Sequence, residues 1–360
     1  MNCKPGMVLR TLVILQMLFW AAPAFAQEPA VPTTIPEMWN SWCARCHGKD
    51  GTGKVTEPTV TVVPMDFTKC KLSTAEGDPD WEAVIAKGGP VVGLSSQMPA
   101  WGDVLKPEQI TEFVGFVKKF CAEPGWPSGN LNLPRPMFAE KAFLEDEFII
   151  APVLSHRKGE PNDVDLAAIY EMRLGRRAQL EAVLPMASVN PGAGRNTGLS
   201  DIELGLKYAL NPTTSNHLFT LGMDFVLPTG RESRGLGAGT AGFEPYLATA
   251  STIGTQTYLQ TQLKIEMPKN APWKDRAVLY NIYLGHDLKL LPSSYTFGIE
   301  FNGENDELAL TPQLRKGLSK SGALAGAFGV RLPLNNRNEQ GVKWVGYLLW
   351  EYLEPVLSRR

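Results

Sequence analysis

The sequence of 360 residues predicts a multidomain chain, in which a small all-α domain precedes an antiparallel transmembrane β-barrel of about 12 strands. Three observations predict this fold. Apolar residues recur with the 3.6-residue period of helices up to about residue 122, and they alternate with period two from about residue 145 onwards. A segment rich in proline and glycine separates the two regions, as is typical of a linker between domains.

The first 26 residues predict a secretory signal peptide. Lys4 and Arg10 precede an apolar core at 13–20, and Ala-Phe-Ala at 24–26 forms a cleavage site of small residues. An N-terminal membrane anchor is the alternative, but the apolar run is shorter than the ~20 residues that a spanning helix needs. We therefore expect an exported protein whose cysteines meet an oxidising compartment.

Overall composition excludes some classes of protein. The chain carries 35 basic and 37 acidic residues, so its net charge is −2 and no basic excess predicts a nucleic-acid partner. Hydrophobic residues make up 44% of the chain, which is too many for a disordered protein. A globular or membrane protein is therefore expected.

The strongest local signal is the C-x-x-C-H pattern of Cys43, Cys46 and His47, which is typical of covalent haem attachment. The seven residues before it predict a short helix capped by Thr33 or Thr34, so the cysteines lie about one helical turn apart. A glycine-rich turn follows and lets the chain leave the haem face. We expect one covalently bound haem c with His47 as an axial ligand of its iron.

A second axial ligand is expected, because low-spin electron carriers fill that position with Met or His. The helical region offers Met38, Met65 and Met98. Met38 lies too close to the attachment helix to cross the haem, and Met65 lies in a separate loop. Met98 precedes a proline that fixes a tight loop, so we expect Met98 to bind the iron, with core packing as the alternative.

Four cysteines follow the predicted signal peptide, and the haem takes two of them. The other two, Cys70 and Cys121, are expected to form a disulfide, which is the default in an exported domain. It would close a loop of ~50 residues and contribute on the order of 3–4 kcal/mol. Two unpaired thiols are the alternative.

Residues 34–122 resemble a class I c-type cytochrome. The resemblance rests on the C-x-x-C-H motif with the glycines behind it, on Met98-Pro99-Ala100-Trp101, and on an amphipathic helix at 107–120. It implies a helical fold around one covalent haem, with His47 and Met98 as axial ligands and one haem edge exposed. With both axial positions filled, the iron transfers single electrons, so we expect an electron carrier and not an enzyme.

Beyond the expected semi-rigid linker at 123–144, apolar and polar residues alternate in long runs. Most runs hold about 10 to 13 residues, which exceeds the ~5–6 of soluble strands and matches the ~9–11 of tilted membrane strands. A soluble β-sandwich or propeller is the alternative. The runs lie near 146–156, 163–174, 177–188, 199–210, 217–228, 241–251, 255–267, 276–289, 294–303, 306–315, 321–333 and 341–353.

Connections and charges refine the predicted barrel. Short connections near Gly175, Gly254 and Ser319 alternate with longer ones, as in outer-membrane barrels whose N-terminus is periplasmic.

Inward-facing side chains that carry both positive and negative charges favour a narrow or plugged pore over an ion-selective one. These side chains are Asp165, Glu171, Arg173, Glu181, Glu203, Lys207, Asp224, Lys264, Glu266, Glu300 and Arg315.

The predicted domains are a signal peptide at 1–26, a monohaem cytochrome domain at 27–122, a linker at 123–144, an outer-membrane barrel at 145–353 and a tail at 354–360. The whole chain is similar to the fused porin–cytochromes of bacterial outer membranes. That resemblance implies electron exchange between extracellular donors, such as ferrous iron, and periplasmic carriers. This chain departs from that pattern, because its cytochrome region is full-sized and its barrel is too narrow to hold it.

We therefore expect an electron carrier that the barrel anchors in the outer membrane, with the cytochrome domain in the periplasm. Expected partners are a periplasmic carrier or redox protein, the outer-membrane lipid, and a small redox compound at the barrel mouth. The alternatives are a transporter for a small solute, such as an aromatic one, with an accessory cytochrome domain, and a conduit for extracellular donors such as ferrous iron. A barrel that serves only as an anchor is a further alternative.

Overall fold

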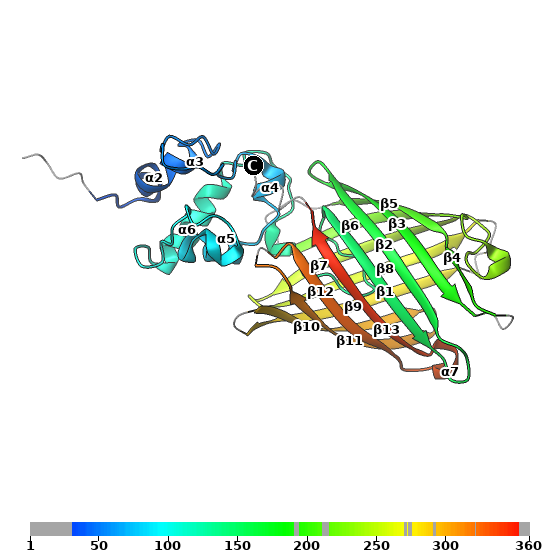
Figure 1. Ribbon diagram of the computed structural model, residues 1–360. Helices are drawn as coiled ribbons and strands as arrows, with labels where there is room; N and C mark the ends of the chain where they lie inside the picture. The colour runs from blue at the N-terminus through cyan, green and yellow to red at the C-terminus, as the bar shows by residue number, and fades with distance from the viewer. Residues whose placement is uncertain are drawn as a thin grey trace, which may run out of the picture.

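The computed structural model describes residues 31–190, 194–210, 216–269, 272, 276–290, 293–320 and 322–352. The predicted signal peptide and C-terminal tail lie outside the described residues. A helical domain lies at one end of a long β-barrel (Figure 1). No helix in the described part of the chain is long and apolar enough to cross a membrane.

The helical domain begins with one continuous helical run formed by α2, η1 and α3. Thr34 caps it, because its Oγ1 accepts a hydrogen bond from the Glu37 backbone N–H at 3.4 Å and its own N–H donates to Glu37 Oε2 at 3.1 Å. The elements of this part of the chain are α2 (Ile35–Met38), η1 (Trp39–Cys43), α3 (Ala44–His47), α4 (Cys70–Ser73), α5 (Asp78–Lys87), η2 (Gly89–Val92), α6 (Pro107–Lys118) and η3 (Gly129–Leu131).

The first and last helices of this domain pack against each other through aromatic rings. The Trp39 ring lies 5.7 Å from the ring of Phe116 and 5.0 Å from that of Phe120, measured between centroids. Gly51 must be glycine, because its φ is +74° and an added Cβ would meet the Phe120 ring at 2.5 Å.

The predicted amphipathic helix at 107–120 is confirmed as α6. Its apolar residues Ile110, Phe113, Val114 and Val117 are buried in the core of the helical domain.

The β region forms a closed antiparallel barrel. β3 pairs with both β4 and β5, which are successive pieces of one broken strand, so the thirteen strands make a 12-strand barrel that closes between β1 and β13. The strands are β1 (Glu147–His156), β2 (Asp163–Leu174), β3 (Ala178–Val189), β4 (Asn196–Leu199), β5 (Ile202–Ala209), β6 (His217–Leu227), β7 (Gly242–Ile253), β8 (Thr257–Pro268), β9 (Ala277–Leu290), β10 (Ser293–Glu304), β11 (Glu307–Gly317), β12 (Leu324–Pro333) and β13 (Val342–Glu351).

The outer surface of the barrel is apolar around its circumference. Large hydrophobic side chains point outward from successive strands, and rings stand near both ends of the strands, as in membrane barrels. Outward leucines and isoleucine include Leu166, Leu184, Leu206, Leu221, Leu263, Ile282, Leu314 and Leu348. Outward aromatics include Tyr208, Phe219 and Trp350 near one end, and Phe225, Phe243 and Trp344 near the other.

The inner surface is polar, as the alternation predicted. Glu171, Arg173, Lys207, Asp224 and Glu300 are all buried inside the barrel. A period of two leaves one face of each strand for lipid and the other for the lumen. Buried charges on the inner face therefore need partners within the lumen.

The predicted alternation of short and long connections holds only in part. β2–β3 and β7–β8 are joined by short turns, but around Ser319 strand β11 ends at Gly317 and β12 begins only at Leu324, so this connection is not short. At the opposite end, Asn305 and Asp306 alone join β10 to β11, and Asn305 adopts a φ of 51°. Such a left-handed residue permits a tight two-residue hairpin without a long outer loop.

Candidate functional site

Cys43, Cys46 and His47 lie together at the end of the first helical run. Cys43 ends η1, and Cys46 and His47 end α3, so one short stretch of backbone presents all three. Both cysteines are unpaired and half-buried, whereas the other two cysteines of the described residues are bonded to each other. Two unpaired thiols one turn apart fit attachment of a haem through two thioether bonds.

The imidazole of His47 is held in an aromatic environment. Its ring stacks on Phe67 with centroids 4.9 Å apart and lies 6.0 Å from the ring of Trp39. Burial lowers its pKa to about 4, so the ring is neutral at neutral pH. The buried Nδ1 has no hydrogen-bond partner among the described residues. A neutral imidazole with an unpartnered buried nitrogen fits a haem-iron ligand.

Met98 lies in a loop that packs beside the attachment helix. The Met98 carbonyl accepts a hydrogen bond from the Gly89 N–H at 3.0 Å, which closes the loop at its base. Trp101, three residues later, stacks on Trp42 with centroids 5.4 Å apart and ring planes 15° apart. Because Trp42 directly precedes Cys43, the loop of Met98 lies on the same part of the domain as the cysteines.

The predicted disulfide between Cys70 and Cys121 is present. The two Cα atoms are 5.0 Å apart, and the residues are separated by 51 positions in the chain. The bond joins the start of α4 to the segment that follows α6. It therefore holds together the part of the helical domain from which the chain continues towards the barrel.

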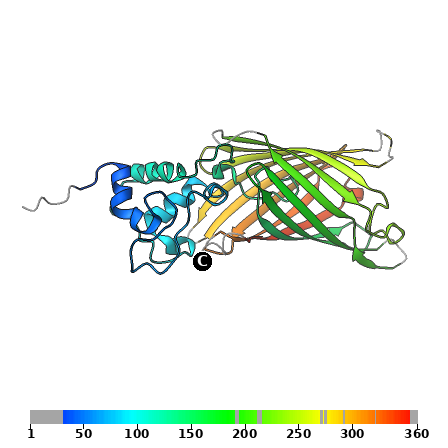
Figure 2. The same ribbon diagram turned by 90° about the horizontal axis from the view of Figure 1, so that it is seen from above.

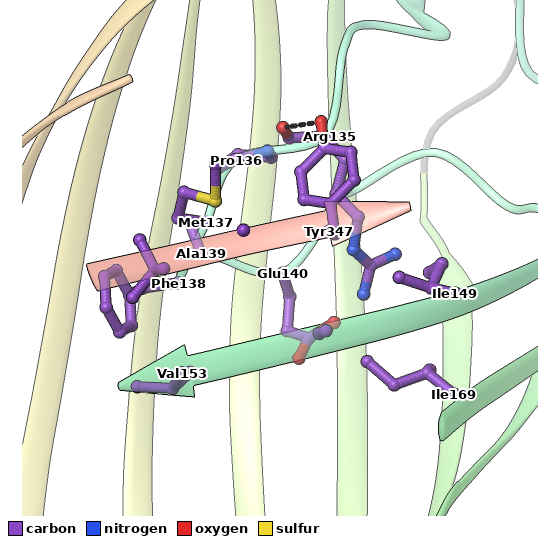
Figure 3. A pocket seen from close by; sticks show the side chains of 13 residues that line it. Arg135, Pro136, Met137, Phe138, Ala139, Glu140, Ile149, Val153, Ile169 and Tyr347 are labelled. Atoms are coloured by element: carbon purple, nitrogen blue, oxygen red, sulfur yellow. Dashed lines mark hydrogen bonds between the residues drawn. The ribbon is translucent and has the colours of Figure 1, made fainter. Parts of the chain in front are cut away.

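The segment expected to be a linker is instead a plug inside the barrel, which corrects its predicted role as a semi-rigid tether. From Leu131 to Asp146 the chain runs through the lumen, and Figure 3 shows residues 135–140 of this segment between the strands of the wall. Ala142, Phe143 and Leu144 have no exposed surface. They share a buried cluster with inward side chains such as Tyr246 and Tyr283. The segment cannot act as a free tether, because burial in the lumen fixes it.

Glu300 of β10 holds the middle of the plug. Its carboxylate accepts hydrogen bonds from three successive backbone N–H groups, those of Met137 at 3.0 Å, Phe138 at 3.2 Å and Ala139 at 2.6 Å. Gln313 Nε2 donates a fourth bond at 3.1 Å, and Glu300 is fully buried. Burial of a charged carboxylate away from water is unfavourable, and hydrogen bonds from several donors offset that free energy.

Other barrel side chains bind carbonyl groups of the plug. Irregular backbone inside a barrel needs such partners, because no neighbouring strand supplies them. The bonds run from Lys207 Nζ to Lys141 O at 2.8 Å, from Thr220 Oγ1 to Ala142 O at 2.7 Å, from Gln260 Nε2 to Pro134 O at 2.8 Å, and from Tyr347 Oη to Arg135 O at 2.9 Å.

Two cations of the plug are paired with carboxylates of the lumen. Arg135 Nη1 lies 2.8 Å from Glu171 Oε1 and 3.8 Å from Glu147 Oε2. Lys141 Nζ lies 2.5 Å from Glu145 Oε1 and 3.3 Å from Glu147 Oε1. Glu145 itself belongs to the plug, whereas Glu147 and Glu171 belong to strands of the wall. Removal of one partner from a buried pair leaves an uncompensated charge, so the pairs with Glu147 and Glu171 hold the plug in position.

The helical domain rests on the end of the barrel where β1 begins and β13 ends, which we call the proximal mouth (Figure 2). Lys71 of α4 pairs with Asp146 at 2.9 Å, and Arg176, in the turn between β2 and β3, donates to the Pro124 carbonyl at 2.9 Å. The guanidinium of Arg173 lies 5.0 Å from the ring of Trp126. The candidate haem site therefore lies outside the barrel, beside a plugged mouth.

A small cavity remains between the plug and the barrel wall. Its volume is about 150 Å³, and residues 135–140 of the plug line one side of it. The opposite side is formed by apolar side chains of β1, β2 and β13, including Ile149, Val153 and Ile169 (Figure 3). The cavity shows that the plug fills this sector of the lumen incompletely.

Together the site and the fold define a c-type cytochrome domain joined to a plugged outer-membrane β-barrel. Residues 30–117 match the family described as cytochrome C oxidase, cbb3-type, subunit III, so the helical domain is cytochrome-like. The barrel, apolar outside and polar within, places the protein in the outer membrane. The chain thus joins a cytochrome-like helical domain to a closed 12-strand antiparallel barrel.

Several solved barrels are similar to part of the chain. The KdgM porin is 8% identical and covers 57% of this chain and 99% of its own, with a TM-score of 0.39. An outer membrane channel from Pseudomonas putida F1 is 16% identical, covers 61% and 99%, and has a TM-score of 0.38. The NanC porin is 8% identical, covers 57% and 98%, and has a TM-score of 0.40. No curated protein matches the sequence.

The charges of both signs predicted a narrow or plugged pore, but the sequence did not indicate that residues 131–146 form the plug. The signal that could have indicated it is the run Ala142-Phe143-Leu144, which is apolar inside a segment otherwise typical of a solvated linker. Arg135 and Lys141 stand just before this run. An apolar run of this kind is more favourably buried than exposed to solvent, and the structure places it in a buried apolar cluster.

Proposed function

We propose that the protein is a monohaem electron carrier that the plugged barrel fixes at the periplasmic face of the outer membrane. Cys43 and Cys46 would hold the haem through thioether bonds, and His47 and Met98 would bind its iron. Such a haem supplies one-electron transfer at a potential that the Met ligand raises. The aromatic side chains around His47 keep water from one side of the site and orient its ring.

The observation that carries this proposal is the continuity of the cytochrome domain with the plug. The chain passes from the disulfide at Cys121 to the buried plug residues near Leu131 through a segment of nine residues, 122–130. The domain is therefore held at the proximal mouth and does not diffuse beneath the membrane. A domain carrying an export-dependent haem belongs on the periplasmic side, so its partner is a periplasmic carrier, a redox protein or a small redox compound.

Access of the haem to oxidants on either side of the membrane tests this proposal. In intact cells, a polymer-linked oxidant too large for any porin should leave the reduced haem spectrum unchanged. The same oxidant should oxidise the haem once the outer membrane is permeabilised. Rapid oxidation in intact cells would show that electrons reach the haem from outside the cell, and the proposal that its partner is periplasmic would then be wrong.

A second candidate function is solute transport through the barrel, with the cytochrome as an accessory domain. The observation that favours it is a polar network on the lumen wall, where Asn281 donates to Gln262 at 2.8 Å, Asn302 donates to Asn281 at 2.8 Å and Thr311 donates to Asn302 at 2.6 Å. Displacement of the plug would expose this wall to water. Conductance of the purified protein in a planar bilayer tests this function: no channel under any condition would exclude it.

A further inference from the structure

Two cations stand directly opposite each other on the lumen wall, near the mouth where β1 ends and β13 begins. Arg331 of β12 and Lys343 of β13 are cross-strand neighbours, and we call them the distal cation pair. The residues that follow them, Leu332 and Trp344, point outward, so both cations face the lumen. Only 7% of the Arg331 surface is exposed, and its guanidinium carbon lies 6.0 Å from the ring centroid of Phe138 in the plug.

The distal cation pair has no counter-charge in contact with it. In the part of the chain that the structure describes, neither side chain forms a hydrogen bond or an ion pair. Carboxylates of Asp165, Glu304 and Glu307 lie within electrostatic range, but none is as close as the 4.0 Å of an ion pair. Like charges opposite each other in an antiparallel pair repel, and a buried guanidinium without acceptors is unfavourable. An anion between the two side chains would relieve both effects.

The apolar cavity beside the plug lies next to this pair. Val345, the lumen-facing residue after Lys343, lines the cavity about 6.6 Å further along β13. Phe138, which lies beside Arg331, lines it too, and Figure 3 shows Phe138 and Val153 near the end of β1. A cavity of about 150 Å³ with apolar walls is large enough for one benzene ring. The cations thus stand at one end of a space that fits an aromatic ring.

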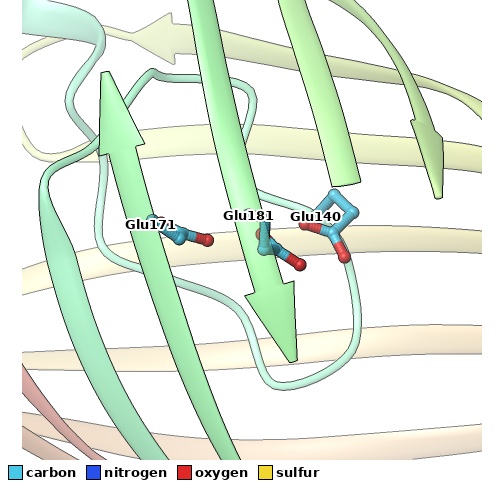
Figure 4. A group of neighbouring side chains, drawn as sticks. All are labelled: Glu140, Glu171 and Glu181. Atoms are coloured by element: carbon cyan, nitrogen blue, oxygen red, sulfur yellow. The ribbon is translucent and has the colours of Figure 1, made fainter. Parts of the chain in front are cut away.

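Acidic side chains lie on the other side of the cavity and orient a charged ligand. Glu140 of the plug lines the cavity. It gathers with Glu171 of β2 and Glu181 of β3, and one oxygen from each lies within 4.8 Å of the other two (Figure 4). Arg135, the cation that lines the cavity, is already paired with Glu171 at 2.8 Å. A carboxylate ligand is therefore repelled from this side and attracted to the distal cation pair.

We propose that the distal cation pair and the cavity together bind a small aromatic carboxylate, such as benzoate. The carboxylate accepts hydrogen bonds from the planar guanidinium of Arg331 and the ammonium of Lys343, since both are donors without acceptors. The ring lies in the cavity among Phe138, Val153 and Val345. The site gives the second candidate function its class of solute, and its physiological role rests on that function, whereas binding itself requires no transport.

Equilibrium dialysis of radiolabelled benzoate against the full-length holoprotein in detergent tests the proposal. We expect one saturable site per chain. Acetate lacks the ring and benzyl alcohol lacks the charge, so each should displace benzoate at least about tenfold more weakly than unlabelled benzoate does.

Variants locate the site on the lumen wall. Arg331→Gln and Lys343→Gln should each weaken benzoate binding about tenfold or more, because each removes a charged donor. Neither variant breaks an ion pair, so both should fold. Ala151→Leu keeps the charges but fills the cavity that Ala151 lines, and it should weaken binding by a similar factor. Lys316→Gln is the matched control, because it removes a cation at the opposite end of the barrel. Haem absorbance and circular dichroism establish that each variant has folded.

Absence of saturable benzoate binding up to about 10 mM would overturn the proposal. Equal affinity of the unmodified protein and both charge variants would overturn it too, because the carboxylate would then lie elsewhere. Equal displacement by acetate and benzoate, or unchanged binding in folded Ala151→Leu, would show that the cavity holds no ring and would also overturn it. Binding without channels in planar bilayers would support the site and exclude transport, whereas channels without binding would overturn the site and support transport.

Discussion

Glu300 is the contact whose loss should release the plug most directly. Its carboxylate accepts hydrogen bonds from the backbone N–H groups of Met137, Phe138 and Ala139, and the side chain is fully buried on β10. Each hydrogen bond to a charged group contributes about 1.5–3 kcal/mol, but the three share one acceptor and their donors can rebind water in the lumen. We therefore expect Glu300→Ala to weaken the seated state of the plug by about 3–5 kcal/mol.

That free energy corresponds to a rise of roughly two to three and a half orders of magnitude in the ratio of displaced to seated plug, at about 1.4 kcal/mol for each tenfold change. Amide hydrogen exchange at residues 135–141 should therefore accelerate by a similar factor in Glu300→Ala. In planar bilayers, brief channel openings should become more frequent. Glu266→Gln, which changes a lumen carboxylate that does not bind the plug, should behave as the unmodified protein does.

The result that would refute this reasoning is unaltered exchange of the plug amides in a folded Glu300→Ala variant. The plug would then be held by its other contacts, chiefly the ion pairs of Arg135 and Lys141. Equal conductance of the unmodified protein and the variant would show instead that the plug does not block the lumen. Exchange and conductance thus separate how the plug is held from what it obstructs.

Three further predictions concern the cytochrome domain. Met98→Ala should abolish the Met–iron charge-transfer band in the visible spectrum, whereas Met65→Ala should retain it; a band that survives Met98→Ala would remove Met98 from the iron. Replacement of Cys70 and Cys121 by serine should lower the free energy of unfolding of the domain by about 3–4 kcal/mol, since the bond spans 51 positions, and an unchanged denaturation midpoint would contradict this. Burial opposes ionisation of Asp78, but hydrogen bonds from Asn130 and Lys118 outweigh it and lower the Asp78 pKa. A lowered pKa in the folded state stabilises the domain above the unfolded value of about 4, and this contribution is lost as the pH falls through the folded value. Asp78→Asn should therefore flatten the acid limb of stability against pH, and an identical acid limb would contradict this.

Much of the fold followed from local sequence. The helix at 107–120 and the succession of about twelve strands were predicted from the spacing of apolar residues, and the helix at 36–42 was predicted from its capping residues. The disulfide between Cys70 and Cys121 followed from the number of cysteines and the exported context. These features were predictable because each depends on neighbouring residues or on a pair that had no other partner.

The connections of the barrel were less predictable. Turn length around Ser319 and the two-residue turn at Asn305 depend on where each strand leaves the sheet, and hydropathy determines strand ends only within a few residues. β4 begins at Asn196, inside a region that was expected to be loop. Its pairing with β3 stabilises this short strand, and that pairing is a tertiary contact.

The sequence by itself determined the chemistry of the haem motif and the two periodicities, because covalent attachment and amphipathic faces are local properties of the chain. Only the tertiary structure decided where residues 123–144 go. Their composition suits a solvated tether as well as a plug, and the lumen that holds them exists only when β1 pairs with β13, about 200 residues away, as in the pair Phe148 and Trp350. The partners that fix the plug lie on strands distant in sequence, and Glu300 follows Ala139 by 161 positions. Closure of the barrel thus turns a proline-rich segment into a buried element whose polar groups need the inner wall as their partner.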